Sequence, residues 1–209
     1  EIGRGISTGA AGATAALTGL VVGTQELNGD LARLRTNAVV AGVGIDEAES
    51  AFTRLYQISG EADSSVEAVS NLLASGFEGE TLSGALENIA GAAIRFSDTL
   101  NIEGIADGLQ ETLASGEAIG QFGELLERSE VDVEAFNEGL SKITDEGART
   151  QYALDTLNKI GLTETSELFA KLNPEVAANQ TAVANFQIAL SDLSLILTPL
   201  ITYVTELIT

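Results

Sequence analysis

The sequence predicts an all-α protein, in which a series of short amphipathic helices is followed by a long C-terminal coiled-coil-like helix. Between residues 24 and 172, apolar residues recur every three or four positions, which is the spacing of one helix face. Glycines at positions 76, 79, 116 and 161 separate these segments and predict tight joints. Period-two alternation and hairpin signals are absent from the sequence, so no strands are expected.

These patterns divide the chain into three predicted parts. Residues 1–42 form a Gly- and Ala-rich N-terminal helix or lead-in, whose apolar spacing becomes regular from Thr24. Residues 43–172 form a compact multi-helix domain, and residues 173–209 form the C-terminal coiled-coil helix. Gly42 and Gly44 stop the first part. Asn173 is placed to cap the last helix, with Pro174 as its first residue.

Two further signals place the helix starts inside the predicted domain. The segment Ser64–Glu67 has the spacing of a capping box, in which a Ser side chain and a Glu side chain satisfy backbone N–H groups reciprocally. Acidic residues cluster where other helices are predicted to begin, as at Asp132 and Asp145. Carboxylates there complement the helix dipole, so part of the acidity needs no ligand to explain it.

The C-terminal segment carries two sets of apolar residues, each with a seven-residue spacing. Steps that alternate three and four residues form the a and d seam of a coiled coil. We predict an oligomer interface formed by Val176, Asn179, Val183, Phe186, Leu190, Leu193, Leu197, Leu200, Val204 and Leu207. Flanking positions such as Ala182 and Ile201 are also apolar, and no Lys or Arg follows Lys171. A seam this wide predicts a homo-oligomer with more than one partner helix.

The sequence leaves other interpretations of this C-terminal segment open. It is also compatible with a buried terminal helix of a globular bundle. A membrane span is disfavoured because Asp192 and Glu206 interrupt the apolar run and no basic flank follows it. Thr198-Pro199 predicts either a kink or a restart of the helix, with Thr198 as cap and Pro199 as first residue.

Composition narrows the possible functions. The chain of 209 residues has a formal net charge of −21, with 10 Lys and Arg and no Cys, His, Met or Trp. This charge opposes phosphate binding, so no direct nucleic-acid binding is expected. The missing Cys and His remove the thiolate and imidazole ligands and bases, so we expect no catalytic residues, no cofactor and no metal site. The sequence begins without Met, and we expect it to be a piece of a longer protein.

Two weak enzymatic signals in the sequence also have structural interpretations. Gly108-Leu109-Gln110 is similar to the Gly-x-x-Gln element of lytic transglycosylases, but it lacks the accompanying Glu-Ser. Glu124 and Glu127 are paired carboxylates, and a glycosidase needs two facing acids in a cleft. On the surface of a helix in so acidic a chain, solvated charge is the expected interpretation. The sequence therefore predicts a protein that is not an enzyme.

Residues 25–208 resemble the tail tape-measure proteins of long-tailed bacteriophages. The resemblance is carried by the order of helices and by the segments 31–38 (LARLRTNA), 58–77 (ISGEADSSVEAVSNLLASGF), 105–116 (IADGLQETLASG), 120–129 (GQFGELLERS) and 131–136 (VDVEAF). One departure is Glu130, where relatives carry Gly after Arg-Ser. A left-handed helix end would be strained with Glu, so this joint is expected to differ.

The resemblance implies a long helical protein that fills the lumen of the tail tube and sets tail length. Such proteins leave ahead of the DNA during genome ejection, and their C-terminal portion meets the tail-tip proteins. They are thought to assemble as a few parallel copies, usually three, which agrees with the wide seam. The implied location is the virion, in the tail-tube lumen near the tip, and the host cytoplasm during assembly. Transient contact with the host membrane, as a membrane-active or pore-forming segment, is the alternative function; a cell-wall-degrading domain is a weaker one.

Overall fold

The part of the chain described by the computed structural model is entirely helix and loop, as the sequence predicts. It covers residues 25–208, with side chains described from residue 27 to residue 193. The helices are α2 (Gln25–Ala41), α3 (Ile45–Ser59), α4 (Ala62–Ala74), α5 (Gly79–Arg95), α6 (Ile102–Ser115), α7 (Gly120–Arg128), α8 (Val133–Ser141), α9 (Glu146–Ile160), α10 (Thr163–Leu172) and α11 (Pro174–Ile208). The all-α prediction is confirmed.

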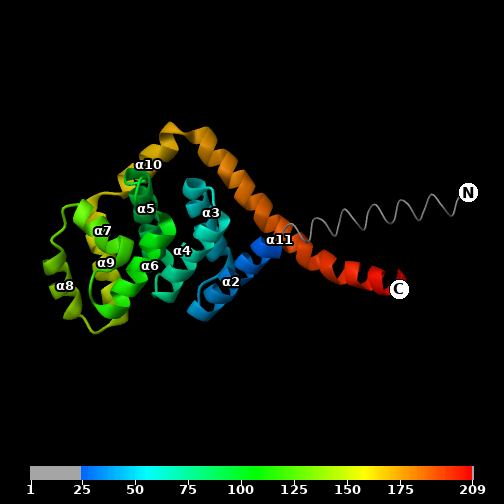
Figure 1. Cartoon of the computed structure of the whole chain (residues 1–209), viewed down its shortest axis with the longest axis horizontal. Helices are drawn as coiled ribbons and strands as arrows, with labels where there is room; N and C mark the ends of the chain where they lie inside the picture. The colour runs from blue at the N-terminus through cyan, green and yellow to red at the C-terminus, as the bar shows by residue number, and fades with distance from the viewer. Residues whose placement is uncertain (1–24, 209) are drawn as a thin grey trace, which may run out of the picture.

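Helices α2 to α9 pack into one body, from which α10 leads to the long α11 (Figure 1). Within the body, α4 packs against α2, α3 and α6, while α5 packs against α3, α9 and α10. The largest fully buried side chains include Phe52, Phe77, Phe122 and Leu109. The predicted apolar stripes point into this core, because residues three and four apart share one face of a helix.

The three-part division of the sequence stays a prediction, but its segments have clear positions in the fold. Helix α2, from the predicted lead-in, contributes Leu31, Leu34 and Ala38 to the buried core. Helices α3 to α10 lie in the predicted multi-helix domain, and α11 begins at Pro174 as predicted. Residues 1–24 lie outside the described part of the chain.

Several helix starts are capped by the side chains that the sequence suggests. The Oδ1 atom of Asp132 accepts a hydrogen bond from Ala135 N at 3.0 Å, and that of Asp145 accepts one from Ala148 N at 2.8 Å. These bonds satisfy N–H groups that have no partner within the helix. The acidic residues at these starts therefore have a structural role, as predicted.

The predicted capping box at Ser64–Glu67 is wrong. Helix α4 already begins at Ala62, so Ser64 and Ser65 lie inside it, and Ser65 Oγ donates to the Glu61 carbonyl at 2.7 Å. A Ser hydroxyl satisfied by a carbonyl one turn back fits inside a helix and no longer caps it. The equivalent capping contact occurs at the start of α5, where Thr81 Oγ1 accepts from Glu78 N at 3.1 Å.

The long C-terminal helix is continuous. α11 runs from Pro174 to Ile208 as one element, so the alternative of a restart at Thr198-Pro199 is not observed. Asn173 separates α10 from α11; its Nδ2 donates back to the Phe169 carbonyl at 3.0 Å, which closes α10. The two helices meet at a sharp bend (Figure 1).

The joint after α7 has the left-handed geometry that glycine favours. Glu130 has a φ of 58°, and Val131 N donates to Leu126 O at 3.0 Å across the helix end. The expectation that Glu would change this joint is therefore wrong. Glu130 therefore adopts a conformation that costs an L-residue about 1–2 kcal/mol.

Replacing Glu130 with Gly should stabilise the domain by about 0.5–1 kcal/mol, because removal of the strain exceeds the added entropy of the unfolded chain. The matched control is Glu127→Gly, an exposed position inside α7, which should destabilise by about 1 kcal/mol. Chemical denaturation of both variants measures the difference. Destabilisation by Glu130→Gly equal to that of the control would show that position 130 carries no strain.

Candidate functional site

Helix α11 places one face against its own domain. Ala184 and Ser191 are buried and Ala177 is half-buried; these three residues are spaced by seven and share a face. This face packs on α3 and, further along, on α2. It is offset by one residue, about 100° around the helix, from the predicted a positions Val176 and Val183. The domain therefore covers a different side of α11 from the predicted seam.

The contacts between α11 and α3 are largely polar. Gln57 Nε2 donates to Thr181 Oγ1 at 2.6 Å, and Gln187 Nε2 donates to the Tyr56 hydroxyl at 3.5 Å. Ile188 adds a partly buried apolar contact to the core. Sequence reasoning did not identify this docking face. The seven-residue spacing of Ala177, Ala184 and Ser191 is the signal that it left unused.

Arg35 of α2 connects three helices. Its Nε donates to Glu49 Oε1 of α3 at 2.7 Å, and its Nη2 donates to Asp192 Oδ1 of α11 at 2.7 Å. Burial lowers the pKa of Arg35, but the hydrogen bonds and the charges of Glu49 and Asp192 outweigh burial and raise the pKa above its ordinary value. The guanidinium therefore stays charged and holds two carboxylates that would otherwise repel.

Five of the six predicted interface residues whose side chains are described are exposed. Val176, Asn179, Val183, Phe186 and Leu193 are exposed, and Leu190 is half-buried. Phe186 is 63% exposed and Leu193 is 44% exposed. The remaining four predicted positions, Leu197, Leu200, Val204 and Leu207, lie outside the described side chains. We call the exposed row from Val176 to Leu193 the α11 seam.

The terminal-helix alternative would require the α11 seam to be buried in its own bundle, but the seam is largely exposed. Its assignment as an oligomer interface stays a prediction. Exposed apolar side chains also continue before it, at Leu168 and Leu172 of α10. Because the non-helical Asn173 separates Leu172 from α11, these two residues lie outside the heptad of the α11 seam.

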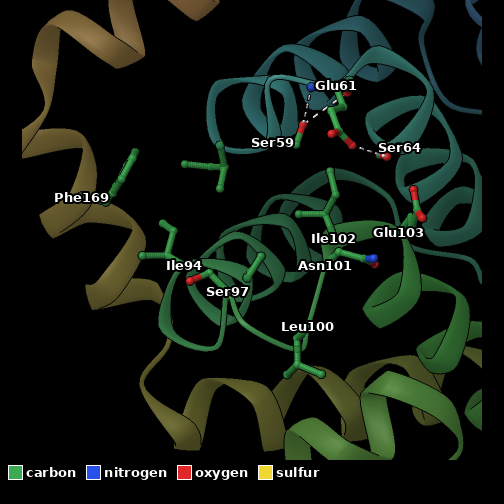
Figure 2. A pocket seen from close by; sticks show the side chains of 12 residues that line it. Ser59, Glu61, Ser64, Ile94, Ser97, Leu100, Asn101, Ile102, Glu103 and Phe169 are labelled. Atoms are coloured by element: carbon green, nitrogen blue, oxygen red, sulfur yellow. Dashed lines mark hydrogen bonds between the residues drawn. The ribbon is translucent and has the colours of Figure 1, made fainter.

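A cavity of about 340 Å³ lies between the ends of α3 and α5 and the starts of α4 and α6 (Figure 2). Its polar groups bond to neighbouring helix ends. Glu61 N donates to Ser59 Oγ at 3.1 Å, Ser64 Oγ donates to Glu61 Oε2 at 3.1 Å, and Gly104 N donates to Asn101 Oδ1 at 2.7 Å. Ile94, Leu100, Ile102 and Phe169 supply apolar walls. Of these side chains, Asn101 caps α6, and Ser59, Glu61 and Ser64 are bonded to one another near the start of α4.

The two enzymatic candidates have structural roles. Glu124 accepts a hydrogen bond from Arg128 Nε at 2.8 Å, one turn along α7, and Glu127 is exposed. Gly108 lies where α6 meets the start of α7, and a Cβ there would lie 2.8 Å from the Ile119 carbonyl oxygen. Close approach of two helices explains this glycine, and Leu109 beside it is buried in the core.

The described residues form neither a metal site nor a membrane-spanning helix. Among them, no cluster of three or more acidic, His or Cys side chains has a geometry that could hold a metal ion. No helix in this part of the chain is long and apolar enough to cross a membrane.

Comparison of the chain with protein-family models, with curated proteins and with solved structures found no match.

Proposed function

We propose that this chain is part of a bacteriophage tail tape-measure protein, a structural protein that sets tail length. The proposal is supported by the resemblance of residues 25–208 to tail tape-measure proteins. It is also supported by an architecture that combines a compact helical body with a long emerging helix. In this proposal the protein fills the tail-tube lumen, contacts tail-tube and tail-tip proteins, and is released during genome ejection. It acts as a scaffold and not as an enzyme.

The α11 seam is the observation that carries the proposal. A helix that packs one face on its domain and leaves an adjacent heptad of apolar residues exposed is suited to assembly. In the proposed assembly, α11 helices of identical copies associate in parallel through the α11 seam and its predicted continuation to Leu207. Each copy keeps its domain on the outside, because the docking face and the seam lie on different sides of α11.

Charge distribution supports copies of the same chain as the occupants. Residues 174–209 carry only Glu175, Asp192 and Glu206 and no basic residue, whereas the chain as a whole has a net charge of −21. Association along this segment brings together few like charges, whereas residues 43–173 carry 25 acidic and 7 basic residues, a net charge of −18. Ala182 and Ala189 are exposed and apolar at a flanking position of the heptad, where a two-stranded coiled coil usually carries charge, and this supports more than two helices.

The acidic charge also fits a protein that shares a tube with DNA without binding it. A net charge of −21 repels phosphate, so we propose no direct nucleic-acid contact. A tape-measure protein with this property can leave the lumen ahead of the genome. The proposed location is the tail-tube lumen near the tip in the virion, and the host cytoplasm during assembly.

Substituting Phe186 with Asp should abolish self-association of the chain. Phe186 is largely exposed in the single chain, so the domain should remain folded, whereas a charge in the assembled seam costs several kcal/mol, or at least about 100-fold in affinity. Sedimentation velocity over a concentration series measures the effect.

The matched control for this substitution is Ala178→Asp, which adds the same charge at an exposed position of α11 outside the seam. It should associate like the unmodified chain. A monomeric unmodified chain at the highest concentration, or equal effects of the two substitutions, would contradict the proposed interface.

Deletions in the parent protein test its role as a ruler. In-frame deletions in a repetitive helical stretch outside residues 1–209 should shorten tails by about 1.5 Å per residue removed, the rise of an α-helix. Deleting residues 44–172 should instead abolish or misdirect assembly, because these helices fold back into a body and do not extend. Electron microscopy of tails measures both outcomes. Proportional shortening by the second deletion would show that this region acts as extended ruler.

A further inference from the structure

The contact between α11 and the domain differs from the contacts inside the domain. Helix α11 contributes only Ala184 to the buried apolar side chains of the described residues. The other core residues come from α2 to α9 and from the loops up to Leu162. The core is therefore nearly complete without α11, and little apolar area holds this helix in place.

Polar groups at this contact are incompletely satisfied. Gln187 Oε1 is buried and accepts no hydrogen bond from any described residue, although its Nε2 contacts the Tyr56 hydroxyl. A buried acceptor without a donor favours the state in which water reaches it. Undocking of α11 would hydrate this oxygen, so the arrangement opposes tight and permanent docking.

Electrostatics make Arg35 the decisive contact. A groove of about 410 Å³ between α3 and α11 is lined by Asp46, Glu49 and Asp192, and no Lys or Arg is among its lining residues. Arg35 joins Glu49 to Asp192 from the side of α2. Without this guanidinium, the carboxylates of α3 would repel that of α11 and favour its departure.

The joint between α10 and α11 is suited to a hinge. Asn173 alone separates Leu172 from Pro174, and its φ and ψ of −126° and 53° are not helical. On the domain side, α10 is anchored where Leu162 lies against Gly91 of α5, so closely that a Cβ at Gly91 would collide with the Leu162 carbonyl. Rotation about Asn173 would move α11 while α10 stays in place.

We propose that α11 rotates about Asn173 between a docked and a released position while the domain stays folded. In the docked position, the ion pairs of Arg35 hold α11 against the domain. Release changes the direction in which α11 leaves the domain. This inference concerns contacts within one chain and does not depend on the proposed function or on self-association.

The test is a distance measurement on the full chain with spin labels at Glu67→Cys of α4 and Ala182→Cys of α11, both exposed positions. The chain has no native Cys, so labelling is specific. Doubly labelled chains are diluted into unlabelled chains, so that only distances within one chain are recorded. The parent pair should give mainly one docked distance, and Arg35→Gln should raise the ratio of released to docked chains about tenfold or more.

Arg33→Gln is the matched control, since Arg33 lies on the same helix, is 74% exposed and pairs locally with Asp30. It should leave the docked distance unchanged. Adding Asp192→Asn to Arg35→Gln should partly restore docking, because it removes the carboxylate that faces Glu49 once the guanidinium is gone. Higher ionic strength should release the parent chain and have less effect on Arg35→Gln.

Circular-dichroism melting of the same variants distinguishes release from unfolding. Under the proposal, Arg35→Gln releases α11 while the main melting transition of the domain stays within a few degrees of the parent. Identical distance distributions in the parent, Arg33→Gln and Arg35→Gln chains would overturn the proposal. So would release that occurs only together with loss of the domain's helical signal.

Discussion

The fold depends on burial of the apolar faces of helices that are too short to be stable alone. Helices α7 and α8 have nine residues each, and α2, the longest in the body together with α5, has 17. Isolated helices of this length are marginally stable in water, because forming the first turn orders three residues for only one hydrogen bond. Each must therefore bury its apolar stripe against several neighbours at once. One shared core results, and the loss of any stripe weakens all its neighbours.

Helix α11 escapes this constraint because of its length. With 35 residues it can propagate helix far beyond its contacts with the domain. It gives the core one small side chain, Ala184, and keeps larger apolar residues such as Phe186 exposed. The contact between α11 and the domain therefore buries little apolar area, while larger apolar side chains on another face of α11 stay exposed. The proposed assembly and the proposed release of α11 both follow from this difference.

Much of the body could be predicted from the sequence, because one rule of spacing decides both helix and burial. The stripe Leu31, Leu34 and Ala38 and the stripe Ile105, Leu109 and Leu113 are buried as their spacing predicts. Pro174 marks the start of α11 for an equally local reason, since proline fits the first turn. These features need no knowledge of the partners in space.

Features that depend on distant partners could not be predicted in this way. Ser64 matches the first residue of a capping motif, but the residue that precedes α4 is Glu61, three residues earlier. Glu130 adopts a left-handed conformation despite its local cost. Arg35 looked like an ordinary surface residue, and only the fold brings it between Glu49 and Asp192, which is 157 positions away. The orientation of the α11 seam likewise required the docking face to be known.

The central claim is that α11 presents its a and d face to identical copies in parallel. Because the chain lacks cysteine, single-cysteine variants of the full chain give a direct test by oxidation and denaturing electrophoresis. Asn179→Cys, on the exposed seam, should form a disulfide between copies, because parallel helices in register bring identical d positions together. Asn185→Cys, equally exposed but outside the seam, should remain largely monomeric. Equal cross-linking of the two variants, or none at position 179, would contradict the account.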